Sequence, residues 1–293
     1  MICSIARLVC CIAALVCLGV SAGIRAADLP PATKIAGGLK NPESVAVGAD
    51  GRMYVSIIGE RGKEGDGQVA VIVDGKAVPF ATGLGDPRGI VAVKDRLFVT
   101  DNVRVWSIDR DGKATILADK PAFPVEPIML NDITSDGQGN LYVSDSGAMT
   151  GGGGKVFCIA SDGKVTLVVD EQKIPGLIRP NGVLIDRNKN LLLADARAGV
   201  LYRITLPDGS HQKIAEELGS PDGIVEDASG TLYTSDNRGG RILRISPSND
   251  EPVVVAEGLP SAADMCLASS GKEFLVPDMK SGSLWRQPLA AGK

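Results

Sequence analysis

The sequence contains a single histidine, His211, among 293 residues. Because His211 lies at the start of a predicted outer strand, the sequence disfavours a Ser-His-Asp triad. No long basic run is present and the net charge is −4, which argues against nucleic acid as a partner. The same charge favours a cationic or neutral ligand. Only 4% of residues are aromatic, whereas 36 glycines and 17 prolines predict many turns and few long helices.

Long apolar segments are also scarce, and the one candidate covers residues 8–20. A bilayer-spanning helix needs about 20 such residues, so a membrane anchor is the weaker alternative. A basic residue precedes the run, and small residues follow it, with possible cleavage sites after Ala22 or Ala26. This layout is typical of a secretory signal. We expect residues 1–26 to be removed, leaving residues 27–293 as an exported domain, periplasmic or secreted, without a membrane anchor.

One sequence frame recurs along the rest of the chain. Each copy has a short strand, a polar turn and a second strand that usually ends in aspartate. The clearest copies are Leu130-Asn131-Asp132-Ile133 leading to Asp145, Pro180-Asn181-Gly182-Val183 leading to Asp195, and Pro221-Asp222-Gly223-Ile224 leading to Asp236. Two earlier copies begin at Pro42 and Pro87, and a degenerate sixth surrounds Ala263-Asp264-Met265. The recurring aspartates are expected to cap turns.

Two further strands follow each frame, giving four strands per repeat of 41 to 50 residues. Such a unit cannot bury its faces alone, and six of them predict an all-β, six-bladed β-propeller with four antiparallel strands per blade. The last copy lacks a fourth strand, but residues 33–39 resemble the fourth strand at residues 212–218. We therefore expect the N-terminal strand to complete the last blade and close the ring. A sandwich or a stack of unrelated hairpins is the alternative.

The second residue of each frame is expected at one mouth of the central channel, because the first strand of a propeller blade lines the axis. These residues are Glu43, Arg88, Asn131, Asn181, Asp222 and either Ala263 or Asp264. Two carboxylates and two amides form a hard-oxygen set suited to Ca²⁺ and unsuited to zinc or copper. The alternative is a hydrogen-bonded polar plug of the channel.

The frames at Glu43, Asn131, Asn181 and Asp222 resemble the blade-leading motifs of the gluconolactonase and senescence-marker-protein family of six-bladed propellers. This family is similar in architecture to paraoxonases and the squid phosphotriesterase, and the resemblance covers residues 33–287. It implies that Glu43, Asn181 and Asp222 hold a divalent cation and that Asn131 contacts the substrate or the metal. It also implies hydrolysis of a lactone or related ester.

A bound Ca²⁺ would act as a Lewis acid in such a reaction without histidine or serine. The general base is then expected to be a carboxylate, with Asp222 as the first candidate and Asp132 as the second. A solvent-facing turn position is the alternative for Asp132, since strand alternation turns neighbouring residues apart. Arg88 either binds a substrate carboxylate or phosphate, or pairs with a nearby acid.

Two other functional classes fit the same scaffold. A non-catalytic propeller of the NHL type would bind protein or glycan and would use the axis residues only structurally. A quinone-dependent sugar dehydrogenase would require histidine and arginine in the pocket, and the position of His211 disfavours it. Two glycine-containing loops, residues 59–68 and 147–155, are expected on the same mouth as the metal, either as flaps or as plain surface loops.

Four of the six cysteines lie within residues 1–26. The other two, Cys158 and Cys266, fall in blades that face each other across the expected ring. That separation exceeds the roughly 6 Å between Cα atoms in a disulfide. We therefore expect two buried free thiols.

Overall fold

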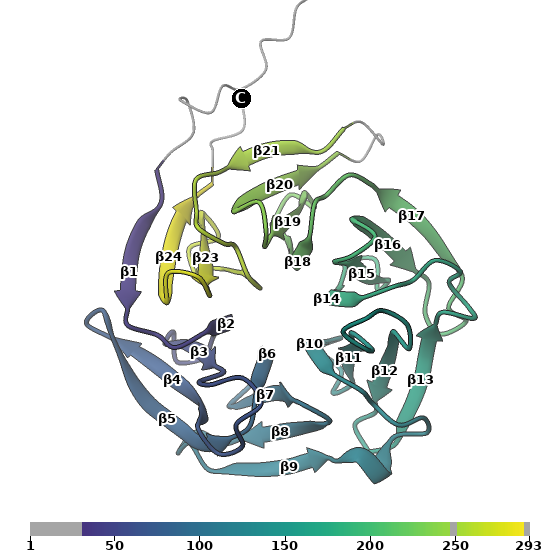
Figure 1. Ribbon diagram of the computed structural model, residues 1–293, viewed down its shortest axis with the longest axis horizontal. Helices are drawn as coiled ribbons and strands as arrows, with labels where there is room; N and C mark the ends of the chain where they lie inside the picture. The colour runs from purple at the N-terminus through teal and green to yellow at the C-terminus, as the bar shows by residue number, and fades with distance from the viewer. Residues whose placement is uncertain (1–30, 247–250, 290–293) are drawn as a thin grey trace, which may run out of the picture.

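The computed structural model describes residues 31–246 and 251–289, and these residues form a ring of six four-stranded antiparallel sheets (Figure 1). The predicted six-bladed β-propeller is confirmed. The expected signal at residues 1–26 lies outside the described residues. No helix within the described ranges is long and apolar enough to cross a bilayer.

The first half of the ring is formed by three blades in chain order. Blade 1 contains β2 (Pro42–Val47), β3 (Met53–Ile57), β4 (Gly67–Val73) and β5 (Lys76–Leu84). Blade 2 contains β6 (Pro87–Val93), β7 (Arg96–Asp101), β8 (Arg104–Ile108) and β9 (Ala114–Ala118). A short 3₁₀ helix, η2 (Lys120–Ala122), leads into blade 3, which contains β10 (Leu130–Ser135), β11 (Leu141–Asp145), β12 (Lys155–Ile159) and β13 (Val165–Asp170).

The second half follows the same order. Blade 4 contains β14 (Pro180–Ile185), β15 (Leu191–Asp195), β16 (Val200–Ile204) and β17 (His211–Ala215). Blade 5 contains β18 (Pro221–Glu226), β19 (Leu232–Asp236), β20 (Arg241–Ile245) and β21 (Val253–Ala256). Blade 6 contains β22 (Cys266–Leu267), β23 (Glu273–Asp278), β24 (Ser283–Pro288) and, from the other end of the chain, β1 (Thr33–Gly37).

The ring is closed by pairing of the two ends of the described chain. β1 runs antiparallel to β24, with Thr33 opposite Arg286 and Gly37 opposite Ser283. Figure 1 shows β1 in purple along the outer side of the yellow β24. The predicted closure by the N-terminal strand is therefore confirmed, and it pairs the outer edge of the third strand of blade 6.

The hydrophobic core lies between neighbouring blades. Val105 and Ala118 of blade 2 belong to the same buried cluster as Leu141 and Phe157 of blade 3. Phe123, in the connection between these blades, packs edge-on against Phe157 at 4.9 Å between ring centroids. Each blade thus buries its faces against its two neighbours in the ring, as expected for a radial repeat.

The closing aspartates cap turns, as predicted. Asp195 is fully buried, and its Oδ2 accepts a hydrogen bond from the Ile178 amide at 2.6 Å. Its Oδ1 accepts bonds from the amides of Arg179 and Ala198 at 3.1 and 2.9 Å. The carboxylate thus ties the chain entering blade 4 to the turn between β15 and β16. This explains its recurrence without a catalytic role.

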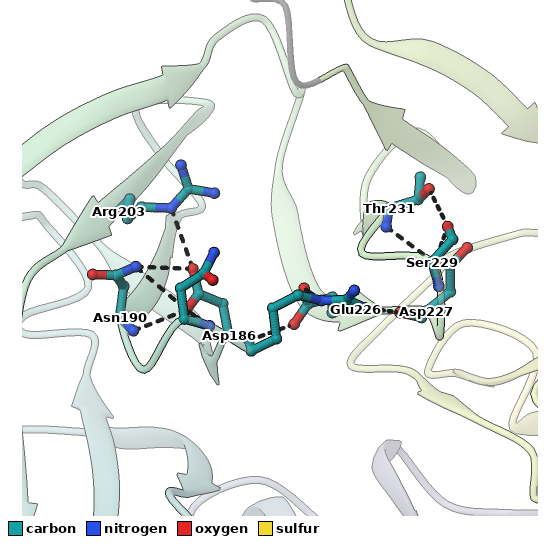
Figure 2. A network of polar contacts seen from close by, with 9 residues as sticks. Asp186, Asn190, Arg203, Glu226, Asp227, Ser229 and Thr231 are labelled. Atoms are coloured by element: carbon teal, nitrogen blue, oxygen red, sulfur yellow. Dashed lines mark hydrogen bonds and ion pairs between the residues drawn. The ribbon is translucent and has the colours of Figure 1, made fainter.

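Polar contacts between blades 4 and 5 occupy the ends of the inner strands (Figure 2). Asp186, directly after β14, lies 3.3 Å from Arg203 Nε and accepts hydrogen bonds from Asn190. Glu226, the last residue of β18, accepts a 2.6 Å hydrogen bond from Arg187 Nε. The frame residues lie at the opposite, N-terminal ends of β14 and β18, so this network holds the blades together away from the predicted site.

Cys158 and Cys266 are unpaired, as expected from their positions in opposite blades. The expectation that both thiols are buried was wrong, because each residue is partly accessible. Burial nevertheless raises the pKa of both thiols, which disfavours the reactive thiolate.

Candidate functional site

The site is formed by irregular starts of the inner strands. In blades 1 to 5 the pairing between the first and second strands shifts register between the first and fourth frame residues. The third residue donates its amide to a hydroxyl of the next strand instead, from Ser44 to Ser56 at 3.0 Å and from Gly223 to Ser235 at 2.9 Å. Such a bulge re-aims the side chains at this point. The frame therefore turns its second residue out of the regular alternation.

Five predicted residues are buried at this mouth of the channel. Their exposed fractions are 4% for Glu43, 9% for Arg88, 5% for Asn131, 8% for Asn181 and 2% for Asp222. They come from five different blades, and only the ring topology brings them near one another. Buried polar groups need partners, so the contacts of each side chain are informative.

The charges of Glu43 and Asp222 lie close enough to influence each other. Burial, followed by the negative charges of Asp222 and Asp264, raises the pKa of Glu43 well above its ordinary value. Burial raises the pKa of Asp222 to about 6, although the neighbouring amides of Asn237 and Asn181 and the charge of Arg88 oppose the shift. Two desolvated carboxylates of like charge are unfavourable unless a proton or cation compensates them.

The strongest sign of a ligand is a set of buried oxygens without hydrogen bonds. In the described part of the chain, seven buried side-chain oxygens lack a hydrogen-bond partner, and four of them belong to the predicted set. These four atoms are Glu43 Oε2, Asn131 Oδ1, Asn181 Oδ1 and Asp222 Oδ1. Leaving buried acceptors unsatisfied is costly. Two carboxylate and two amide oxygens left free in this way match the ligand preference of Ca²⁺.

The candidate site differs from metal centres that are built mainly from acidic, thiolate or imidazole ligands. The described residues contain no group of three or more His, Cys, Asp or Glu side chains placed to hold a metal ion. The predicted set has only two carboxylates, from Glu43 and Asp222, and draws its other oxygens from amides. A cation at this position would therefore depend on Asn131 and Asn181 as much as on the acids.

Two orienting residues were not predicted from the sequence. Asn237 Nδ2 donates a 2.5 Å hydrogen bond to Asp222 Oδ2 and leaves Oδ1 free. Ser146 accepts a 2.8 Å hydrogen bond from Asn131 Nδ2 and donates to the carbonyl of Pro180 in the next blade. Both residues directly follow the closing aspartate of a frame. Comparing that position from blade to blade is the sequence signal that would have identified them.

Asp132 lies on the axis, so the interpretation of this residue as a solvent-facing turn position was wrong. It is 5% exposed, with Oδ1 accepting the Ile133 amide at 2.6 Å and Oδ2 accepting the Val183 amide at 2.7 Å. Asp132 and Asp264 are the two acidic residues that line a cavity of about 260 Å³, which is otherwise lined mainly by apolar residues of the inner strands. Both carboxylate oxygens of Asp132 are thus engaged by the backbone.

A hydrogen bond from blade 5 to blade 6 shows which residue of blade 6 is the second residue of its frame. Ser235 Oγ donates to the carbonyl of Ala263, just as Thr100 Oγ1 of blade 2 donates to the carbonyl of Asn131. Ala263 is therefore the second frame residue and Asp264 the third. Asp264 accepts a hydrogen bond from Ser44 of blade 1, and burial and the charge of Asp132 raise its pKa.

A cavity of about 780 Å³ opens at the same mouth and has Asn181 and Asp222 among its lining residues. Arg61 from the 59–68 loop and Met149 from the 147–155 loop also line it, as expected for loops on this side. Arg88 Nη2 lies 3.8 Å from Asp86 Oδ2, a long ion pair, while its Nε lacks a partner. Pairing with an acid is thus observed for Arg88, and substrate binding by this residue stays a prediction.

Comparisons with known proteins agree with this architecture. The family model for the SMP-30/gluconolactonase/LRE-like region matches residues 80–275, which is 196 of the 293 residues. The gluconolactonase structure from Xanthomonas campestris superposes with a TM-score of 0.73 at 17% identity, covering 91% of each chain.

Two other solved structures share the fold. A structural-genomics protein described as a candidate gluconolactonase has a TM-score of 0.71 at 20% identity, covering 90% of this chain and 97% of its own. A luciferin-regenerating enzyme has a TM-score of 0.68 at 16% identity, covering 90% and 98%. No curated protein matches the sequence significantly. The family model matches about two thirds of the chain, so the protein belongs to the SMP-30/gluconolactonase/LRE-like family.

Proposed function

We propose that the protein is a metal-dependent hydrolase that opens a lactone or related ester at the axis of the propeller. The observation that carries the proposal is the group of four buried, unpartnered oxygens from Glu43, Asn131, Asn181 and Asp222. Family membership and the gluconolactonase-like architecture support the reaction class. Ca²⁺ is the proposed cofactor, since it accepts several neutral and charged oxygens together.

When bound by these four residues, a divalent cation supplies Lewis-acid polarisation of the ester carbonyl. Asp222 is proposed as the general base, which accepts a proton from the attacking water as the water oxygen adds to the ester carbonyl carbon, and Asn237 fixes its orientation. The ring C–O bond then breaks. The proton then passes to the departing ring oxygen, which gives the hydroxy acid. Asp132 is the weaker candidate, because it occupies the third frame position and none of its oxygens belongs to the group of four unpartnered oxygens.

A non-catalytic propeller of the NHL type would use these residues only to seal the channel. In that case their polar atoms would be expected to satisfy one another. Instead, the amides of Asn131 and Asn181 each leave the carbonyl oxygen free. This argues for a site that receives a ligand rather than a self-contained polar plug.

Hydrolysis of aldonolactones and aryl esters by the purified residues 27–293 tests the proposal. We expect turnover that disappears after removal of divalent cations and returns with Ca²⁺, together with calorimetric binding of Ca²⁺ by the wild type. Absence of both Ca²⁺ binding and hydrolysis would overturn the proposal. Export also remains a proposal, tested by finding the chain processed after Ala22 or Ala26 outside the cytoplasm.

Stability of the metal-free protein is expected to fall as pH rises from 5 to 7. Asp222 has a folded-state pKa of about 6 against an ordinary value of 3.8, so the unfolded chain loses this proton at lower pH than the folded one. The full shift corresponds to about 3 kcal/mol, which is lost mainly between about pH 4 and pH 6, and about 1 kcal/mol of it falls between pH 5 and pH 7. The pKa values of Glu43 and Asp264 shift in the same direction.

Denaturant unfolding of metal-free protein at pH 5 and pH 7 measures this loss. Saturating Ca²⁺ should raise the free energy of unfolding more at pH 7 than at pH 5, because only ionised carboxylates bind the cation well. Asp227 and Asp236 have lowered pKa values, so their contribution to the free energy of unfolding changes at pH values below 5. A metal-free stability that rises between pH 5 and pH 7 would contradict the expected cost of burying ionised carboxylates.

A further inference from the structure

Four arginines surround the cavity above the candidate site and form what we call the arginine collar. Arg61 comes from the loop between β3 and β4, and Arg179 immediately precedes β14. Arg197 and Arg238 come from the turns after β15 and β19. All four line the cavity of about 780 Å³, a volume within the range of small-molecule sites.

The collar arginines form no close ion pair with the described residues, although the negative charges of Asp222 and Glu43 act on Arg179 and Arg61. None of its arginines lies within ion-pair distance of a carboxylate in residues 31–246 and 251–289, whereas most other arginines there do. The guanidinium groups of Arg61 and Arg179 instead lie against the sulfurs of Met279 and Met149, at 3.8 and 3.4 Å.

The two acidic residues that line the same cavity, Asp236 and Asp222, are not available to pair with the collar arginines. Asp236 pairs with Arg241 at 2.7 Å and accepts the amides of Ser220 and Gly239. Asp222 belongs to the candidate cation site. The collar therefore faces the cavity with a local charge opposite in sign to the net charge of −4 of the chain.

The arginines also repel one another. Burial, followed by the positive charges of Arg88 and Arg238 and, less strongly, Arg197, lowers the pKa of Arg179, although the negative charge of Asp222 opposes the shift. Like charges gathered in a cavity from separate turns are unfavourable without an anion between them. Guanidinium groups bind carboxylates and phosphates through paired hydrogen bonds, which makes them suited to such an anion.

We propose that the substrate is an anionic lactone, whose carboxylate or phosphate binds the arginine collar while its ester group lies at Asn181 and Asp222. This inference rests on the proposed lactonase function and adds the substrate class. It replaces the sequence-based preference for a cationic or neutral ligand, because local charge rather than net charge governs binding within a cavity.

Substrate selectivity tests the inference directly. The assay compares kcat/KM for a neutral aldono-1,5-lactone, its 6-phosphate and its 6-carboxylate analogue. We expect at least one anionic lactone to be preferred by about tenfold or more, since a charged hydrogen bond contributes at this level. Whether the phosphate or the carboxylate is preferred identifies the anion. The preference should weaken at high ionic strength.

The double variant Arg197→Gln/Arg238→Gln should lose most of this preference. Both side chains are exposed, so the fold is expected to tolerate the change. Arg110→Gln is the matched control, because this exposed arginine lies in the turn after β8, at the other mouth. The proposed role of the collar would be overturned if the wild type and the double variant had the same preference. It would also be overturned if the neutral lactone were hydrolysed at least as fast as both anionic lactones. Either result would leave the lactonase proposal intact.

A binding measurement distinguishes the proposed anion binding by the arginine collar from the proposed lactonase activity. Calorimetry compares a hexitol phosphate and a hexitol carboxylate analogue with the neutral hexitol, none of which can be hydrolysed as a lactone. Tighter binding of an anionic compound by the wild type than by the double variant would support the collar even if no lactone were opened. Equal or weaker binding of both anionic compounds would overturn it.

Discussion

Replacement of Asp222 by asparagine is expected to reduce lactone hydrolysis by about 10²- to 10⁴-fold, the usual contribution of a general base. The variant keeps the shape of the side chain and a hydrogen bond with Asn237, but it removes the negative charge and one free carboxylate oxygen. Calorimetric affinity for Ca²⁺ should fall with the activity. Both losses follow from the position of Asp222 among the four unpartnered oxygens.

The same variant is expected to be more stable than the wild type when metal-free at pH 7. A buried carboxylate with a pKa of about 6 opposes folding at that pH, and the amide removes a penalty of about 3 kcal/mol. Asp264→Asn is the matched control, because it removes another buried axial charge that is not in the proposed ligand set. Activity lost equally in both variants, or retained in Asp222→Asn, would refute the assigned role of Asp222.

The ring architecture was predictable because its evidence is repeated in the sequence. The similarity of residues 33–39 to residues 212–218 predicted the closing strand, which β1 forms against β24. Blade 6 was harder to interpret, since its inner strand β22 is only two residues long. Only the hydrogen bond from Ser235 to the carbonyl of Ala263 shows which residue occupies the frame position.

The candidate site was predictable only where it follows the repeat. Glu43, Asn131, Asn181 and Asp222 occupy one frame position, so topology alone places them at one mouth. Asn237 lies in a turn whose conformation varies between blades, and the frame does not specify the direction of its side chain. The collar depends on turns and loops from several blades, and no local pattern states that such segments share a cavity.

Small residues are required at the third frame position, directly after the second frame residues that form the candidate site. It carries Gly89, Gly182 and Gly223 in three blades, each pressed against the inner strand of the next blade. An added Cβ at Gly223 would lie 2.5 Å from Asp264 Oδ1, and one at Gly89 would lie 2.6 Å from the Cα of Asp132. Close approach of the inner strands thus narrows the channel and brings the second frame residues together.

Gly182→Ala is therefore expected to damage both stability and activity. The new Cβ would lie 1.8 Å from the carbonyl oxygen of Asp222, so the backbone carrying the proposed base must move. Overpacking of this kind costs about 1 to 3 kcal/mol. A displacement of about 1 Å at a catalytic group lowers the rate by about 10²-fold. Denaturant unfolding and kcat/KM for the preferred lactone measure the two effects.

Gly37→Ala provides the comparison for this change, since it also adds a methyl group to a strand glycine. Its nearest obstacles are Cε and Nζ of Lys34, at 2.7 and 3.0 Å, and this exposed side chain is free to rotate away. We expect Gly37→Ala to change neither stability nor activity appreciably. If Gly182→Ala behaved in the same way, the inner strands would have room to separate, and close packing of the channel would not be what positions Asp222.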